Sequence, residues 1–110
     1  SAQAYVDAGL GELVALQAEP DGAESCWHLF VVRSPERDRL CESLSAAGIG
    51  ARSYYETPLY AQPAVSRWAP PEPLPNTEAV CAEILALPMG TALDPAAPAA
   101  VTQAVRDSRA

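Results

Sequence analysis

Lysine is absent from this 110-residue chain, because the 7 basic residues are all arginines. Without a lysine amine the chain has no Schiff-base nucleophile, no P-loop lysine and no lysine general base. Basic residues of any kind are few, and 14 acidic residues bring the formal net charge to −7. This charge argues against a protein that follows nucleic-acid phosphates and against one that binds an anionic membrane surface.

The sequence also lacks closely spaced cysteines and histidines that would form a metal site or a disulfide framework. The three cysteines, Cys26, Cys41 and Cys81, are far apart and odd in number, which predicts free thiols in a reducing, cytoplasmic compartment. They are expected to act as small hydrophobic residues on helix and strand faces. His28 is the only histidine and is expected to be a core residue with a satisfied hydrogen bond rather than a ligand.

Long hydrophobic runs are absent as well. No apolar stretch approaches the roughly 20 residues that cross a bilayer, and no basic segment followed by an apolar one suggests a signal peptide. The chain starts abruptly with a helical pattern, so we expect it to begin inside a longer protein. Its length allows one domain, 1–110, with a modest core.

What is present predicts an α+β fold: a small, mainly antiparallel sheet whose one face carries the helices. Residues 27–33 are aromatic and β-branched, which is typical of a buried strand, and 51–55 resemble a second strand. Apolar periodicity and capping residues indicate helices. The expected helices are 3–16, 35–47, 77–86 and 98–107, with Gly48 ending the second of them and a short extended segment at 87–89.

The segment 56–75 differs in character, because it holds six of the 11 prolines. It is nevertheless too apolar for a free linker, since it includes Leu59, Tyr60, Val65 and Trp68. A long loop of this kind is usually functional or packed on a partner. We therefore predict an interface element.

Five sequence pieces, taken in order, resemble the C-terminal domain of the DegT/DnrJ/EryC1/StrS family of sugar aminotransferases. The pieces are 27–33 (WHLFVVR), 36–40 (ERDRL), 47–50 (AGIG), 54–64 (YYETPLYAQPA) and 85–89 (LALPM). The resemblance covers nearly the whole chain. The family often carries histidine at the positions of Tyr54 and Tyr60 and proline at that of Glu56. Tyrosine cannot act as a base at neutral pH, because its pKa is about 10.

The resemblance implies a fold type I aminotransferase that uses pyridoxal phosphate and forms a homodimer. In such enzymes a large N-terminal domain holds the cofactor and its lysine, and a small C-terminal domain helps to close the active site. This chain resembles the small domain alone. It is therefore expected to hold no cofactor, to lack catalytic residues and to be inactive without the missing N-terminal domain.

Within the resemblance, Tyr54, Tyr55, Tyr60 and Gln62 are the candidate substrate-binding residues. Aromatic faces stack on rings, and phenol and amide groups bond to hydroxyls, so these side chains suit a nucleotide-sugar. Equally, the tyrosines are suited to sealing the loop onto a neighbouring domain, a role that is slightly favoured for Tyr60. For Arg33 and Arg52, pairing with Glu36 or Glu56 is expected over phosphate binding.

Three hypotheses follow. The chain is the small domain of a sugar aminotransferase, a stand-alone or degenerate binding domain without chemistry, or a generic α+β module that binds a small ligand. The upstream reading frame separates the first two. The third requires a self-sufficient core with no apolar face left bare.

Overall fold

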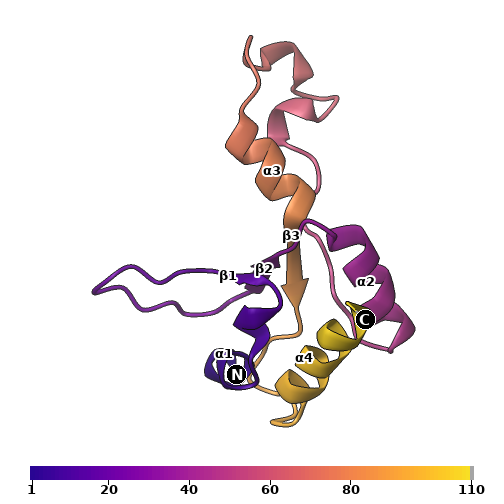
Figure 1. Cartoon of the computed structure of the whole chain (residues 1–110). Coiled ribbons are helices and arrows are strands. Elements are labelled where there is room, and N and C mark those ends of the chain that lie inside the picture. The colour runs from indigo at the N-terminus through magenta and orange to yellow at the C-terminus, as the bar shows by residue number, and fades with distance from the viewer. Residues whose placement is uncertain (110) are drawn as a thin grey trace.

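The computed structural model describes residues 1–109 as a small body from which two segments project (Figure 1). Helices and strands alternate irregularly along the chain. The elements are α1 (Ala2–Asp7), a 3₁₀ turn (Leu10–Glu12), β1 (Ala15–Leu16), β2 (Phe30–Arg33), α2 (Arg37–Ala46), α3 (Pro75–Glu83), β3 (Ile84–Leu87) and α4 (Ala97–Ser108).

The sheet has three strands in the order β1-β2-β3, and both pairings are antiparallel. Phe30 lies opposite Leu87, and Val32 lies opposite Leu85. Because side chains alternate across a strand, these four residues share one face of the sheet. All four are buried. The small antiparallel sheet of the predicted α+β fold is confirmed.

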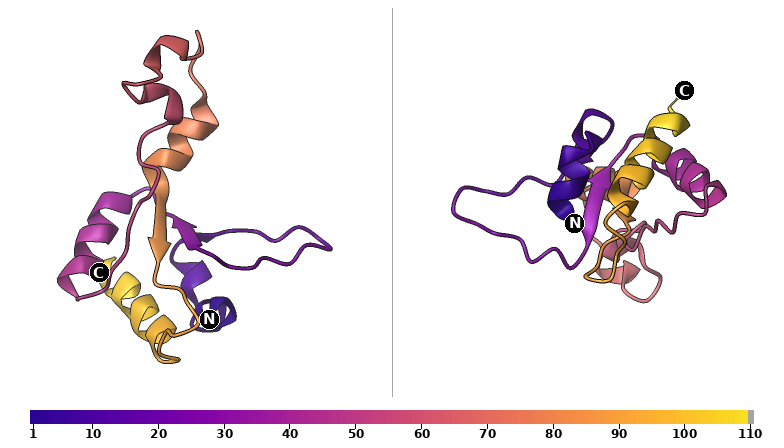
Figure 2. Two further views of the ribbon diagram at one scale, coloured as in Figure 1. Left: turned by 180° about the vertical axis from the view of Figure 1, so that it is seen from behind. Right: turned by 90° about the horizontal axis from the view of Figure 1, so that it is seen from below.

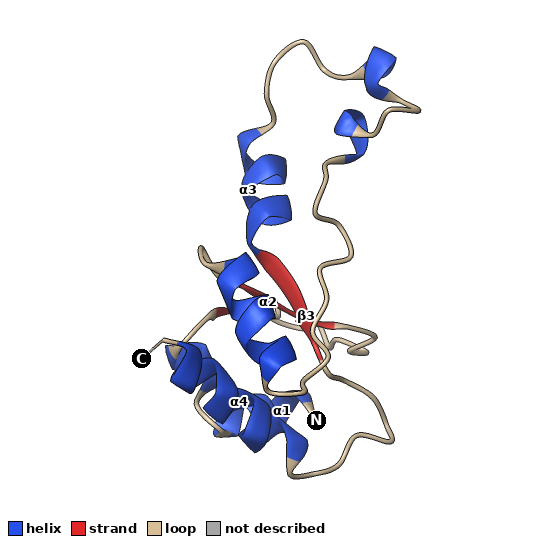
Figure 3. Cartoon of the chain, turned by 90° about the vertical axis from the view of Figure 1, so that its right-hand side faces the viewer, coloured by secondary structure: helices blue, strands red, loops and turns tan. Residues whose placement is uncertain are grey.

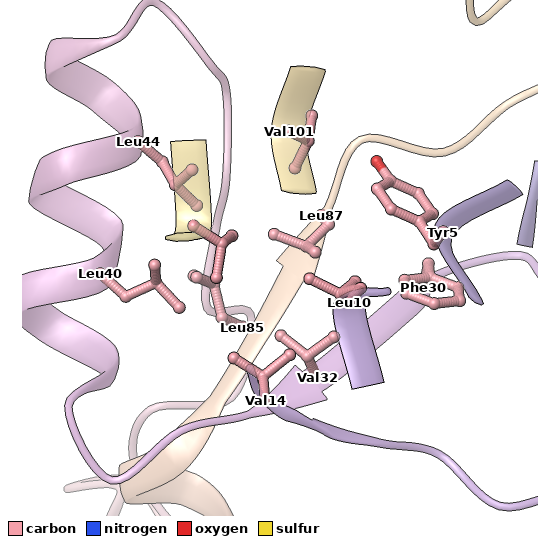
Figure 4. Close-up of a cluster of buried hydrophobic side chains, with 11 residues drawn as sticks. Tyr5, Leu10, Val14, Phe30, Val32, Leu40, Leu44, Leu85, Leu87 and Val101 are labelled. Atoms are coloured by element: carbon pink, nitrogen blue, oxygen red, sulfur yellow. The ribbon is translucent and has the colours of Figure 1, made fainter. Parts of the chain in front are cut away.

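The core lies between this face and three helices, α1, α2 and α4 (Figure 4). Leu44 from α2 and Val101 from α4 belong to it, and α2 packs directly on α4. From α1, the ring of Tyr5 stacks on Phe30 with ring centroids 4.7 Å apart. Leu85, on β3, is fully buried. One face of the sheet thus carries three helices, whereas α3 is not among them.

Two helices end earlier than predicted. The helix expected over 3–16 stops at Asp7, where Gly9 adopts a positive φ of 85° and a 3₁₀ turn follows. The helix expected over 77–86 stops at Glu83. Its last residues instead form β3, because their backbone groups pair with β2 along four residues.

The two predicted strands are also shorter. The segment 51–55 contributes a single bridge, in which the backbone groups of Arg52 and Ala86 exchange hydrogen bonds of 2.8 and 3.1 Å. The strand expected over 27–33 begins only at Phe30. Trp27 has a positive φ of 51°, which is not an extended conformation, so this residue cannot be part of the strand.

Two other expectations were wrong for a related reason. His28 is exposed rather than part of the core, and Cys26 is exposed rather than packed on a strand face. Both lie in the long β1–β2 connection, which extends away from the body (Figure 2). The aromatic and β-branched composition of 27–33 predicted a strand, but among the described residues no strand pairs with 27–29.

Residues 56–83, which we call the arm, extend upward from the body in Figure 1, whereas the β1–β2 connection extends to the side; the arm returns through α3 into β3 (Figures 1 and 3). The proline-rich part forms two 3₁₀ turns, Leu59–Ala61 and Ser66–Trp68, and neither contains a buried residue. Along the described residues, none of the helices has both the length and the hydropathy of a membrane span.

Candidate functional site

Three of the four predicted site residues surround one hollow. Tyr54, Tyr55 and Gln62 line a volume of about 260 Å³ together with Ser53, Glu56 and Thr57. Both tyrosines are exposed, Tyr54 by 54% and Tyr55 by 69%. The hollow is therefore lined by two aromatic residues, an amide, two aliphatic hydroxyl residues and a carboxylate.

The position of the hollow follows from the bridge at Arg52. Its two backbone hydrogen bonds to Ala86 attach the chain to the outer edge of β3. The backbone then leaves the sheet, so Tyr54 and Tyr55 stand where the body meets the arm. Gln62 comes from just after the first 3₁₀ turn of the arm. Such a lining can stack on a ring and bond to its hydroxyls.

Tyr60 lies apart from this hollow. Its phenol donates a hydrogen bond of 3.0 Å to the Glu78 carboxylate on α3. Partial burial, and then the bond and negative charge of Glu78, raise the pKa of Tyr60 above its ordinary value. The hydrogen bond from this phenol to Glu78 ties the proline-rich segment to α3.

Sequence reasoning missed Arg37, whose guanidinium lies beneath the hollow. Arg37 is 8% exposed, and its Nη1 donates a 2.8 Å hydrogen bond to Ser53 Oγ. The signal that could have revealed it is its spacing from Leu40 and Leu44, which places it on the buried face of α2. It stands instead in a run of charged residues that resembles a solvated surface.

The other basic candidate at a strand end, Arg33, has a structural role. Its Nε and Nη2 donate hydrogen bonds of 3.0 and 2.6 Å to the Glu83 carboxylate. An ion pair was expected, but with Glu36 or Glu56 as the partner. Glu83 becomes the partner because the early end of α3 brings it beside β2.

Metal and thiol chemistry find no support in the described part of the chain. Residues 1–109 hold no group of three or more His, Cys, Asp or Glu side chains placed to bind a metal ion. The three thiols are free: Cys81 is buried, Cys41 is half-buried and Cys26 is exposed.

The cofactor implied by the resemblance does not fit these residues. Pyridoxal phosphate needs a lysine amine for its covalent attachment, and no lysine occurs in the sequence. The hollow carries the carboxylate of Glu56 and no guanidinium on its lining, so a phosphate group finds no cation there. We assign no cofactor site to this chain.

Comparison with known proteins shows which family the chain resembles. The model of the DegT/DnrJ/EryC1/StrS aminotransferase family matches residues 2–106. A Streptomyces venezuelae dTDP-3-amino-3,4,6-trideoxy-alpha-D-glucose transaminase is 38% identical over 101 residues, which are 91% of this chain and 26% of that protein. A dTDP-3-amino-3,6-dideoxy-alpha-D-galactopyranose transaminase of Aneurinibacillus thermoaerophilus is 31% identical over 77% of this chain and 23% of its own length.

Solved structures give the same result. The S. venezuelae DesV crystal structure, in complex with a ketimine intermediate, superposes with a TM-score of 0.90 and 35% identity over 96% of this chain. A DegT DnrJ EryC1 StrS aminotransferase from Brucella abortus gives a TM-score of 0.86 and 33% identity. The chain spans 29% and 28% of these two proteins, respectively. On this sequence and structural evidence, the chain belongs to the DegT/DnrJ/EryC1/StrS aminotransferase family.

Proposed function

We propose that the chain is the C-terminal small domain of a pyridoxal-phosphate-dependent nucleotide-sugar aminotransferase of amino-sugar biosynthesis. One observation carries the proposal: the family match runs through residues 2–106 of a chain that spans about a quarter of its relatives and contains no lysine. The covalent chemistry then belongs to a separate N-terminal domain. Two relatives are named as transaminases of dTDP-linked sugars, which supports a nucleotide-sugar as substrate.

The contribution of this chain is to bind and orient the sugar. Tyr54 and Tyr55 offer exposed ring faces, and Gln62 offers two donors and an acceptor on the same hollow. Tyr60 acts indirectly, because its phenol is engaged by Glu78. The absence of a disulfide among the described cysteines supports a reducing, cytoplasmic setting.

The first experiment compares the chain with the longer protein that its gene encodes. Each is incubated with pyridoxal phosphate, reduced with borohydride and analysed by peptide mass spectrometry. We expect a modified lysine only outside residues 1–110, and transamination only by the longer protein. Transamination by the chain alone contradicts the proposal. An upstream reading frame without a lysine-bearing domain would favour the stand-alone binding domain.

A second experiment tests the substrate residues in the longer protein. Tyr55→Ala and Gln62→Ala are each expected to raise the KM for the nucleotide-sugar, because each removes a group from the hollow. Arg39→Ala is the control, because Arg39 is exposed on α2 and does not line the hollow. It is expected to leave KM near its original value. An unchanged KM in both hollow variants contradicts the assignment.

The arm is proposed to contact the N-terminal domain or a second subunit of a homodimer. Leu59 is 76% exposed and Trp68 is 65% exposed, so the isolated chain leaves apolar area uncovered. We expect it to self-associate, and we expect a Leu59→Ser/Trp68→Ser variant to sediment as a monomer. Val6→Ser changes another exposed residue, 49% accessible on α1, and is expected to leave the association unchanged. Two results together would contradict the proposed interface: a wild-type chain that sediments as a monomer, and arm amides that gain no protection from hydrogen exchange when the N-terminal domain is present.

A further inference from the structure

Arg37 is the one charged side chain that is buried in the described part of the chain. It is the first residue of α2. Its Nη1 donates toward Ser53 Oγ at 2.8 Å and toward the carbonyl oxygens of Cys81 and Ile84, each at 3.2 Å. Its Nε donates to the carboxylate of Asp38 at 2.5 Å, and this aspartate side chain is 86% exposed. A single guanidinium thus joins three segments that are distant in sequence.

Two of these acceptors lie at the base of the arm. Cys81 is in the last turn of α3, where carbonyl groups have no partner within the helix. Ile84 opens β3. A cation at the carboxyl end of a helix is also favoured by the helix dipole. Arg37 therefore satisfies backbone acceptors at the point where the arm passes into the sheet.

The third acceptor lies in the hollow. Ser53 follows the Arg52 bridge and precedes Tyr54 and Tyr55, and Ser53 itself lines the hollow. The hydrogen bond to Ser53 Oγ fixes the chain at the residue where it leaves the sheet. No hydrophobic residue at position 37 can supply this contact, and the buried Cys81 carbonyl would lose the same donor.

We propose that Arg37 is a positioning residue, which holds the base of the arm and the 53–55 segment in one fixed arrangement. Its contacts set the relative placement of the tyrosines and of the arm that carries Gln62. We call this arrangement the clamp, and it consists of the hydrogen bonds of Arg37 described above. Only its consequence for sugar binding rests on the proposed function.

The test is residue-resolved amide hydrogen exchange, followed by NMR, on the 110-residue chain. Arg37→Met keeps an unbranched side chain but removes every donor. We expect the amides of Arg52 and Ala86 to exchange about tenfold faster or more, because the contacts that hold the bridge are lost. The amides of Leu44 and Val105, in helices of the core, are expected to keep their protection. The amide resonances of Tyr54 and Tyr55 are expected to shift.

Three further variants make the result specific. Arg39→Met is the matched control, since Arg39 lies on the same helix, is exposed and pairs with Glu36 at 2.9 Å. It is expected to leave the Arg52 and Ala86 amides unchanged. Arg37→Lys keeps a cationic donor and is expected to restore part of their protection. Ser53→Ala removes one contact and is expected to affect the bridge but not α3.

Several results would overturn the clamp. A uniform loss of protection, which includes Leu44 and Val105, would show a purely global role for Arg37. The same local pattern in Arg39→Met would show an effect of charge alone. If Arg37→Met does not fold, unchanged exchange in both Arg37→Lys and Ser53→Ala overturns the proposal. None of these measurements involves a sugar or the cofactor, so they succeed or fail independently of the proposed enzyme activity.

Discussion

Tyr5 is expected to make the free energy of unfolding fall at alkaline pH, and the Tyr5→Phe variant tests this contribution. The side chain is fully buried, and its hydroxyl donates a 2.6 Å hydrogen bond to the Pro88 carbonyl oxygen. Burial raises the pKa of Tyr5 to about 12. Between pH 10 and 12 the folded chain therefore keeps a proton that the unfolded chain has lost. Stability from this proton is complete below pH 10 and is lost as the pH rises toward 12.

The expected magnitudes give a crossing point. Replacing Tyr5 by Phe removes one hydrogen bond, which costs about 1 kcal/mol at neutral pH. The pKa difference of about two units corresponds to roughly 2–3 kcal/mol, which only the wild-type chain loses on alkalinisation. The wild type is thus more stable at pH 7, and the two unfolding free energies cross near pH 11 by this arithmetic.

The assay is urea unfolding of both proteins at a series of pH values from neutral to the alkaline limit. Other groups that titrate in this range are common to both chains and cancel in the difference. No lysine complicates the measurement, since the sequence has none. Two stability curves that remain parallel through pH 11 would refute the reasoning, because a Tyr5 hydroxyl with an ordinary pKa predicts no crossing.

Two other substitutions test the core and a helix end. Leu85→Ala is expected to lower the free energy of unfolding by about 2–5 kcal/mol, since Leu85 is fully buried. Val80→Ala, on the exposed side of α3, is expected to change it little. Similar losses in the two variants would contradict the assigned core. Gly48→Ala is expected to cost about 1 kcal/mol, because Gly48 has a φ of 77° and open space around it. Gly50 also has open space but no positive φ, so an equal loss of stability in Gly50→Ala would contradict the backbone explanation. Chemical denaturation measures the free energy of unfolding of all four variants.

The end of α2 was predictable because its signals are local. Gly48 adopts a left-handed conformation, its N–H bonds to the Ser45 carbonyl at 3.0 Å, and the Ile49 N–H bonds to the Leu44 carbonyl at 2.9 Å. These are the two bonds of a Schellman motif. A glycine placed after an apolar stripe suffices to predict them, and no distant residue is needed.

The strands were predicted less well because distant partners define them. Residues 84–86 continue the apolar spacing of α3, so a helix that ends at residue 86 was a reasonable prediction. Their pairing with Phe30–Arg33 decides otherwise. Conversely, 51–55 has strand-like residues but finds a neighbour only at Arg52. Strand propensity reports a fit to a half-buried surface, and only the fold determines where that surface is.

The site divides in the same way. Tyr54, Tyr55 and Gln62 are close in sequence, and the structure places all three on the lining of one hollow. Tyr60 lies between them in the chain, yet the 3₁₀ turn directs it to Glu78. Arg37 contacts Ser53 from sixteen positions away; its spacing from Leu40 and Leu44 indicates burial, but it does not identify Ser53 as the partner.

The arm is stabilised mainly by contacts at its base. Between residues 56 and 80 no side chain is buried, so this stretch has no core of its own to offset the entropy of ordering it. Contacts at the base, from Arg37 and the Arg33–Glu83 ion pair, fix where the arm begins and ends. They do not reach Leu59 or Trp68, whose apolar area remains exposed. A segment built in this way gains most from a surface supplied by another domain or subunit. This is the physical basis on which we expect the arm to be the most exchange-labile part of the isolated chain and to become protected in the complete protein.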